Sequence, residues 1–402
     1  MGHGNRLAGL WRWAPWVWGS ALSLLLPWTD FTHADGIALE GKAVWGRDFA
    51  NLWGGGRLLG ERGAEALYDL DAYRAFLAEL FGPLKPHNYS YPPVTFPLAE
   101  LFGLLPYGLA LAAWLLGTGG LFVWAARRWW PAQWGPAWLA LLTPAAMMNI
   151  WAGHYGFLLG ALFLAGWAAL DRYPRRAGAA FGLMLVKPHL ALLVPLALLL
   201  RRQWQAILAG AVTVAILLAA TSLLYGWSAW QNFLFGTSAV QAGLIDAGGS
   251  FFGHMSTSLA TAILRFSDNI PLALAAQAML GAAAIAGVVV AARRRTVPTM
   301  ELAMLVATAT FLVLPYAFGY DLTVVMIAAL RLWADPAATR TERHLAIIGF
   351  VAPQIGMLVA PLGVPATPLM LAALFAGQLH LALRRASLAP AAPEAAAAAR
   401  SA

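Results

Sequence analysis

One aspartate in this sequence stands where a carboxylate could do chemistry. Asp48 lies in the stretch Gly46 to Trp53, after the first apolar segment of the chain and within a long polar interval. An ionisable residue at a membrane boundary is a candidate for function. Its carboxylate could accept a proton from a hydroxyl group, as a general base does. Two structural roles compete: an ion pair with Arg47 or Arg57, or a cap on a helix that begins at Phe49.

A second group of polar residues is scattered along the chain but shares one predicted location. If arginine clusters mark the cytoplasmic ends of helices, these residues all fall at outer helix ends or in outer loops. They are Tyr91, His154, Lys187, His189, His254, Tyr320 and Asp321. One common face is what a single active site requires, although polar residues collect on the outer side of any membrane protein.

Lys187 differs from the rest of this group because apolar segments flank it on both sides. A cation at membrane depth needs an anion nearby or a route to the headgroups. A lipid phosphate would supply the anion, and so would a purely structural ion pair with Asp321. For Tyr320 and Asp321 the structural alternative is an aromatic belt followed by a helix-capping aspartate.

The composition places these residues in a membrane protein. Of 402 residues, 60% are hydrophobic and 11% are charged, whereas soluble domains carry about 25% charged residues. Apolar runs of about 20 residues recur, without the two-residue alternation of a membrane β-barrel. The net charge of +8 comes from arginine clusters between apolar runs, which is typical of cytoplasmic loops and argues against nucleic-acid binding. The sequence therefore predicts an all-α, polytopic transmembrane helical bundle.

The topology predicted from the arginine clusters is a single transmembrane domain over residues 1–386. It has about ten full spans, a first periplasmic loop at 29–93 and a second at 226–270, followed by a disordered Ala/Pro-rich cytoplasmic tail at 387–402. The first apolar run is expected to be a retained helix and not a removed signal.

The first loop is predicted to hold two short amphipathic helices at the membrane interface, Phe49 to Leu59 and Leu70 to Phe81. The run Gly54-Gly55-Gly56 lies in the first of them. A close helix crossing explains this run better than a phosphate-binding loop.

The segment between two arginine clusters is too short for two ordinary spans. If Arg176 and Arg201 are both cytoplasmic, residues 177–200 must enter and return, with about a dozen residues in each limb. Such a limb is about 18 Å long, whereas the hydrocarbon core is about 30 Å thick. We therefore expect a hairpin of two short helices with Lys187-Pro188-His189 at its tip. Two short, tilted spans in a thinned bilayer are the alternative.

Metal and thiol chemistry find little support in the sequence. The chain has no cysteine, and its eight histidines include no pair at helical spacing that would suggest zinc. Asp35, Asp48 and Asp321 could converge on a magnesium ion, but nothing in their spacing demands it. No metal or other cofactor is expected.

A series of short motifs supports a resemblance to a known family. The motifs are Gly46-x-Asp48-Phe49-x-x-x-Trp53, Ala66-Leu67-Tyr68-Asp69, Tyr91-Pro92-Pro93, Gly153-His154, Leu185-Val186-Lys187-Pro188-His189-Leu190, and Pro315-Tyr316 with Tyr320-Asp321-Leu322. In this order, the chain resembles glycosyltransferase family 87, which consists of polytopic membrane enzymes of the GT-C superfamily.

The resemblance implies a reaction, its substrates and its location. A sugar would pass, with inversion and without a required metal, from a polyprenyl-phosphate donor to a glycan or glycolipid acceptor. The reaction would occur at the periplasmic face of the cytoplasmic membrane, and the lipid-linked sugar would be a co-substrate. Asp48 would be the general base. From their predicted place on the outer side, and not from the resemblance alone, we expect the donor phosphate and the substrates to be bound by Lys187, His189, Tyr320, Asp321, Tyr91, His154, His254 and Arg57.

Two other classes of membrane protein share the general pattern. A lipid or saccharide transporter also buries charge in a polytopic bundle, but would more often show inverted repeats. An O-antigen polymerase or ligase also has large outer loops, but its main polar loop usually lies mid-chain or later. Here the candidate aspartate follows the first apolar segment.

Overall fold

Helices form almost all of the regular structure in the computed structural model, which describes residues 13–39, 43–85, 87–236 and 251–388. The α-helices are α2 (Ala14–Thr32), α3 (Phe49–Arg62), α4 (Leu70–Phe81), α5 (Phe96–Gly103), α6 (Tyr107–Ala126), α7 (Pro144–Ala152), α8 (Gly156–Ala169), α9 (Pro174–Leu183), α10 (Val194–Leu200), α11 (Trp204–Tyr225), α12 (Trp227–Gln231), α14 (Phe251–His254), α15 (Leu259–Ile263), α16 (Ile270–Arg293), α17 (Thr299–Val313), α18 (Thr323–Ala334), α19 (Arg340–Val359) and α20 (Ala366–Leu388). Three two-residue strands, β1 (Ala34–Asp35), β2 (Ala38–Leu39) and β3 (Ala43–Val44), form a small antiparallel sheet.

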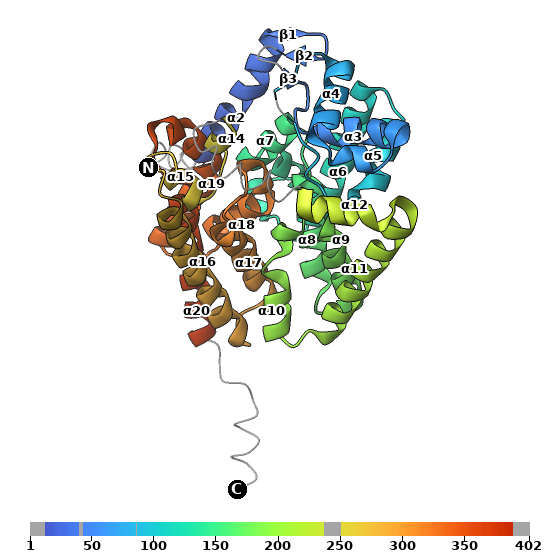
Figure 1. Ribbon diagram of the computed structural model, residues 1–402. Helices are drawn as coiled ribbons and strands as arrows, with labels where there is room; N and C mark the ends of the chain where they lie inside the picture. Colours follow the sequence, from blue (N-terminus) through green and yellow to red (C-terminus); the bar gives the residue numbers. More distant parts are fainter. Residues whose placement is uncertain (1–12, 40–42, 86, 237–250, 389–402) are drawn as a thin grey trace.

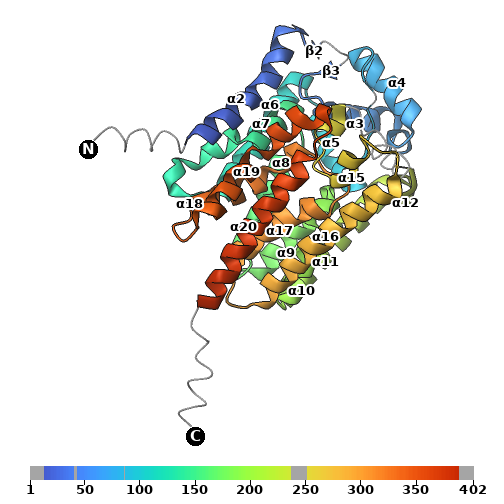
Figure 2. The same ribbon diagram turned by 90° about the vertical axis from the view of Figure 1, so that its left-hand side faces the viewer.

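The elements divide into a bundle and a cap. Figure 1 shows α10, α11, α16 and α20 reaching toward one end of the molecule, while α3, α4, α5 and the small sheet lie at the other. In Figure 2, α16, α17 and α20 run side by side, and they pack directly against one another. The prediction of a helical bundle is confirmed for the described part of the chain, to which the structure adds only the small sheet of β1, β2 and β3.

Five of the described helical segments are long and apolar enough to cross a bilayer. They are Tyr107–Ala126, Trp204–Tyr225, Ile270–Arg293, Arg340–Leu362 and Ala366–Leu388. Gly156–Ala169, Pro188–Leu200, Thr299–Val313 and Thr323–Ala334 are apolar but shorter. The predicted count of about ten full spans is not confirmed.

Proline explains two of the differences from the predicted spans. The span expected from Pro92 to Arg127 is divided at Pro106, which separates α5 from α6 because proline cannot donate the helical hydrogen bond. The span expected at about 135–150 is instead a 3₁₀ helix, η4 (Ala137–Leu142), followed by α7, which begins at Pro144. Hydrophobicity is continuous across both breaks, so the apolar pattern alone does not reveal them.

The first predicted loop contains both of its expected helices. Helix α4 has the predicted bounds, and Asp69 caps its start: the Asp69 carboxylate accepts hydrogen bonds from the backbone N–H groups of Asp71 and Ala72. Helix α3 is buried along most of its length and packs on α5. It is an internal element of the cap, and not an interfacial helix with one open face.

The crossing of α3 and α5 depends on glycine. A Cβ atom on Gly56 would overlap the carbonyl oxygen of Ala99, and one on Gly103 would lie 2.9 Å from the carbonyl carbon of Gly56. Only glycine allows two backbones to approach so closely. The glycine run is thus part of a close helix crossing, as the sequence predicts.

This crossing supports a prediction with a matched control in the same helix. We expect Gly56→Ala to lower the free energy of unfolding by about 1–3 kcal/mol, because the added methyl group forces the two helices apart. A Cβ atom on Gly60 would have no heavy atom within 4 Å, so Gly60→Ala should be neutral or slightly stabilising. Thermal unfolding of both variants in detergent measures the difference. Equal melting temperatures for Gly56→Ala and Gly60→Ala would contradict a close crossing of α3 and α5 at Gly56.

The predicted hairpin is present. Helix α9 leads into the 3₁₀ helix η5 (Met184–Val186), and after Lys187 a second 3₁₀ helix, η6 (Pro188–Ala191), leads into α10. Lys187 interrupts the helices with φ −147° and ψ 75°. Arg201, at the far end of α10, donates a 2.8 Å hydrogen bond to the carbonyl oxygen of Val297. The two limbs are short helices with Lys187 at their junction.

The second predicted loop and the tail are described only in part. Helices α12, α14 and α15 lie within 226–270, and residues 237–250 fall outside the described residues. Backbone hydrogen bonds join this loop to the segment before α18, from Thr257 to Ala317 and from Gly319 to Met255, each 2.9 Å long. The expected disordered tail lies outside the described residues from 389 onward, and residues 387–388 belong to α20.

Candidate active site

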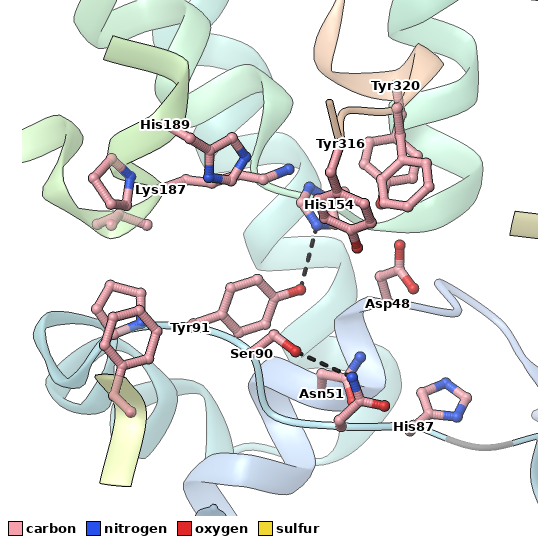
Figure 3. Close-up of a pocket in the computed structure, with 16 residues that line it drawn as sticks. Asp48, Asn51, His87, Ser90, Tyr91, His154, Lys187, His189, Tyr316 and Tyr320 are labelled. Carbon is pink, nitrogen blue, oxygen red and sulfur yellow. Dashed lines mark hydrogen bonds between the residues drawn. The ribbon is translucent and has the colours of Figure 1, made fainter. Parts of the chain in front are cut away.

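A cavity of about 330 Å³ lies between the cap and the tip of the hairpin (Figure 3). Its size falls in the range of small-molecule sites. It is lined by Asp48, Asn51, His87, Asn88, Ser90, Tyr91, Pro92, His154, Val186, Lys187, Pro188, His189, Phe233, Tyr316, Phe318 and Tyr320. Six of the nine residues predicted to form the site therefore share one cavity.

Two glycines bring Asp48 to this cavity. Gly46 and Gly153 both have positive φ, at 73° and 63°, a region that favours glycine. A Cβ atom on Gly153 would lie 2.7 Å from the Gly46 carbonyl oxygen. The close approach lets the backbone N–H of Asp48 donate a 3.0 Å hydrogen bond to the carbonyl oxygen of Ala152. The turn before α3 is thereby joined to the end of α7.

Neither of the two structural roles considered for Asp48 is found. Its side chain does not cap α3, although it precedes Phe49. Arg47 pairs with Asp30 at 2.6 Å, and Arg57 pairs with Glu61 at 3.3 Å. The Asp48 carboxylate instead lines the cavity, on the same side as the labelled residues Tyr316 and Tyr320 (Figure 3).

The surroundings of Asp48 make its carboxylate a better proton acceptor. Burial raises the pKa of Asp48 above its ordinary value, and this effect outweighs the lowering by His87, Lys187 and the Tyr320 hydroxyl. A carboxylate with a raised pKa binds a proton more strongly, which suits a general base.

Lys187 forms the structural ion pair that was the alternative to a ligand-binding role. Its Nζ lies 2.6 Å from Oδ2 of Asp321, and both side chains are buried. The ammonium group also lies 5.5 Å from the centre of the Tyr320 ring. Lys187 nevertheless lines the cavity, whereas Asp321 is not one of the lining residues. An ammonium group has three N–H donors, so the ion pair does not exhaust its capacity to bind an anion.

His154 connects the two walls of the cavity. Its Nε2 lies 3.3 Å from the Tyr91 hydroxyl, and its Nδ1 faces Oδ1 of Asp321 at 3.6 Å. The imidazole stacks on the Tyr320 ring, with centroids 4.3 Å apart. Burial, followed by Lys187 and His189, lowers the pKa of His154, which keeps the ring neutral. These partners favour a proton on Nδ1 and a hydrogen bond from Tyr91 to Nε2.

His189 offers a further polar group in the cavity. It follows Lys187 by two residues, at the start of the second limb of the hairpin. Its Nε2 is buried and has no hydrogen-bond partner among the residues that the structure describes. A buried polar atom without a partner is costly, so this nitrogen is available to a ligand. Figure 3 places His189 beside Lys187, across the cavity from Asp48.

The sequence analysis missed the polar wall beside Asp48. This wall consists of Asn51, His87 and Ser90, which Figure 3 shows on the same side of the cavity, and of Asn88; Tyr316, which was also missed, lines the cavity on the side of His154. Asn88 donates a 3.1 Å hydrogen bond from Nδ2 to the Ser90 hydroxyl. One signal was available, because Asn51 follows Asp48 by three residues and must share its helix face. For the segment 87–90, no local sequence pattern predicts that it lies beside Asp48.

Three predicted candidates lie elsewhere. Arg57 lines a separate surface groove between α3 and α5, and His254 ends α14 without lining the cavity. Asp35 is exposed in β1 and does not converge with Asp48 and Asp321. Within the described ranges, no group of three or more His, Asp or Glu side chains is arranged to hold a metal ion.

The comparison with protein families agrees with the sequence motifs. The family model of glycosyltransferase family 87 matches residues 89–315, more than half of the chain. No curated protein and no solved structure matches the chain. Asp48 precedes the matched range, and Tyr316 and Tyr320 follow it. The fold brings these three residues to the same cavity as Tyr91, His154 and Lys187, which lie within the range.

Proposed function

The chain belongs to glycosyltransferase family 87, and on that premise we propose that it transfers a sugar from a polyprenyl-phosphate donor to a glycan or glycolipid acceptor, with inversion. The reaction occurs in the cavity that holds Asp48 and Lys187, on the periplasmic side of the cytoplasmic membrane, within a fold of the GT-C type. One observation carries the proposal: a carboxylate and an ammonium group from distant segments line the same cavity.

Asp48 is the general base of this reaction. The acceptor hydroxyl forms a bond to the anomeric carbon while the bond from that carbon to the phosphate oxygen breaks. The hydroxyl proton passes to the Asp48 carboxylate, and the lipid phosphate leaves with the bonding electron pair. A carboxylate that neither caps its helix nor pairs with Arg47 or Arg57 is available for this step.

Lys187 and His189 bind the leaving phosphate. The phosphate gains negative charge as the bond breaks, and preorganised donors stabilise that charge in the transition state. The ion pair with Asp321 holds the Lys187 ammonium group in place, and the unpartnered Nε2 of His189 lies on the same wall. Asp321 acts through Lys187 and His154 as a positioning residue.

The acceptor binds against the opposite wall, beside Asp48. Groups of Asn51, Ser90 and His87 lie on this side of the cavity (Figure 3), and Asn88, which is hydrogen-bonded to Ser90, also lines the cavity. Such groups form hydrogen bonds with the hydroxyl groups of a saccharide. With the donor phosphate and the acceptor on different walls, the two groups approach the anomeric carbon from opposite sides, as inversion requires.

The donor class can be tested with the purified full-length protein in lipid nanodiscs. We expect a radiolabelled polyprenyl-phosphate hexose or pentose to yield glycosylated product from a panel of alkyl glycosides, with one polyprenyl phosphate released per product. The same sugars supplied as nucleoside diphosphate sugars should give no product. Transfer from the nucleotide sugars alone would contradict the proposed donor, and retention of the donor's anomeric configuration would contradict inversion.

The proposed orientation predicts which surface positions are accessible from outside the cell. The chain has no cysteine, so single substitutions can be labelled selectively. We expect Asp71→Cys in the first loop and Asp268→Cys in the second to react with an impermeant thiol reagent in intact spheroplasts. Ser387→Cys, at the opposite end of the chain, should react only after lysis. All three positions are exposed, and labelling of only one loop would overturn the topology.

A further inference from the structure

A second hollow, of about 340 Å³, lies far from the candidate active site. It is lined by Trp124, Ala125, Arg127, Arg128, Ala165, Ala168, Ala169, Arg172 and Tyr173. These residues come from the ends of α6 and α8 and the turn before α9. His154 precedes the other end of α8, and the 14 residues of that helix rise about 21 Å. The hollow and the active-site cavity are therefore near opposite ends of α8.

The hollow is strongly basic. Arg127, Arg128 and Arg172 are exposed, and in the described part of the chain none of them forms an ion pair. The lining contains no Asp or Glu. The nearest acid in sequence, Asp171, accepts a 3.0 Å hydrogen bond from the Thr299 hydroxyl. Three guanidinium groups without acidic partners favour an anionic ligand.

Aromatic and apolar surface adjoins these arginines. Two guanidinium groups lie close to the Tyr173 ring, with the Cζ atoms of Arg172 and Arg176 at 5.3 and 4.8 Å from its centre. Trp124 is 61% exposed, and Leu121 and Leu116 continue an exposed apolar face along α6. Helix α6 is long and apolar enough to span a bilayer. Tryptophan and tyrosine at the end of such a helix are typical of headgroup level.

We propose that this hollow binds the phosphate headgroup of an anionic glycerophospholipid. The phosphate contacts Arg127, Arg128 and Arg172, and one acyl chain follows the exposed face of α6 past Trp124. A guanidinium group matches the geometry of a phosphate, and the apolar face selects a lipid over a soluble phosphate ester. The site is independent of the proposed transfer reaction, because it requires only that the protein lies in a membrane.

The test measures lipid binding to the full-length protein in detergent by native mass spectrometry. Phosphatidylglycerol and phosphatidylcholine with identical chains are the probes. We expect the wild-type protein to bind phosphatidylglycerol at least tenfold more tightly. The triple variant Arg127→Gln, Arg128→Gln, Arg172→Gln should lose this preference, because each basic residue near a membrane surface adds about fivefold to anionic-lipid affinity.

A matched triple variant controls for overall charge. Arg293→Gln, Arg294→Gln, Arg340→Gln removes three exposed arginines outside the hollow and should keep the preference. If both triple variants lose the preference for phosphatidylglycerol equally, the proposed site is wrong. If the first triple variant does not fold, Ala168→Leu fills the hollow without changing charge and should also weaken the preference; unchanged binding would overturn the proposal. Full displacement of the lipid by millimolar glycerol phosphate would show a site for soluble phosphates instead.

Discussion

Asp48→Asn is expected to lower sugar transfer by roughly 10²-fold or more while the protein remains folded and inserted in the membrane. The amide preserves the shape of the side chain but does not accept the proton of the acceptor hydroxyl. Because Asp48 neither caps α3 nor pairs with Arg47 or Arg57, the substitution removes no such structural contact. Initial rates with a polyprenyl-phosphate sugar and thermal unfolding of the same preparation measure the two effects.

The pH dependence of transfer identifies the base more specifically. In the proposed mechanism the carboxylate form of Asp48 is the active one, and burial raises the pKa of Asp48 above its ordinary value of 3.8. Activity should therefore fall as the pH is lowered through a value above 3.8, and this acidic limb should be absent from the residual activity of Asp48→Asn. Asp69→Asn is the control, because Asp69 caps α4 outside the cavity and asparagine caps a helix equally well. Unchanged transfer in Asp48→Asn would remove Asp48 from the mechanism.

Lys187→Met is expected to cause two losses that can be separated. The substitution leaves the Asp321 carboxylate buried and without its 2.6 Å partner. Breaking a buried pair from one side costs about 3–5 kcal/mol of stability. Transfer should fall by roughly 10²-fold or more, because the proposed mechanism uses Lys187 to stabilise the charge of the leaving phosphate. Lys85→Met is the control, since Lys85 is exposed and does not line the cavity.

The double variant Lys187→Met, Asp321→Asn separates stability from catalysis. Removing the second charge should recover most of the lost stability, because no unpaired ion remains buried. Transfer should stay low, because the phosphate still lacks its cation. A double variant that regains both stability and transfer would show that Lys187 is only a structural partner of Asp321. Unfolding and transfer rates for the wild type, the single variants Lys187→Met and Asp321→Asn, and the double variant complete this cycle.

Local properties of the sequence determined the kind of fold. High hydrophobicity and apolar runs of membrane length predicted a helical bundle, because the bilayer requires backbone groups to be satisfied within each segment. The spacing of the arginine clusters predicted the hairpin, because a dozen residues form too short a helix to cross the core. Both features depend only on length and composition, and the structure contains both. The predicted number of about ten full spans is not confirmed in the described residues, where prolines divide apolar runs that look continuous in hydropathy.

Part of the candidate site was also present in the sequence. Asp48 was identified by its place after an apolar segment, and Lys187 by its apolar flanks. The sequence alone left at least two possible roles for each residue, one functional and one structural. For Asp48, the geometry at the start of α3 excludes capping, and the pairing of Arg47 with Asp30 takes away one possible partner. For Lys187, the ion-pair partner Asp321 lies 134 positions further along the sequence. No local sequence pattern predicts a contact between residues so far apart.

Only the tertiary structure decided which residues share the cavity. The contact between Gly46 and Gly153 joins the turn at Asp48 to the end of α7, and the segment 87–90 passes beside it. Arg57 and His254, which the sequence analysis proposed as substrate-binding residues, lie outside the cavity. The physical reason is that hydrophobicity and helix length act within a segment, whereas a site forms where segments pack together. Packing depends on contacts such as glycine crossings, whose partners lie far apart in the chain.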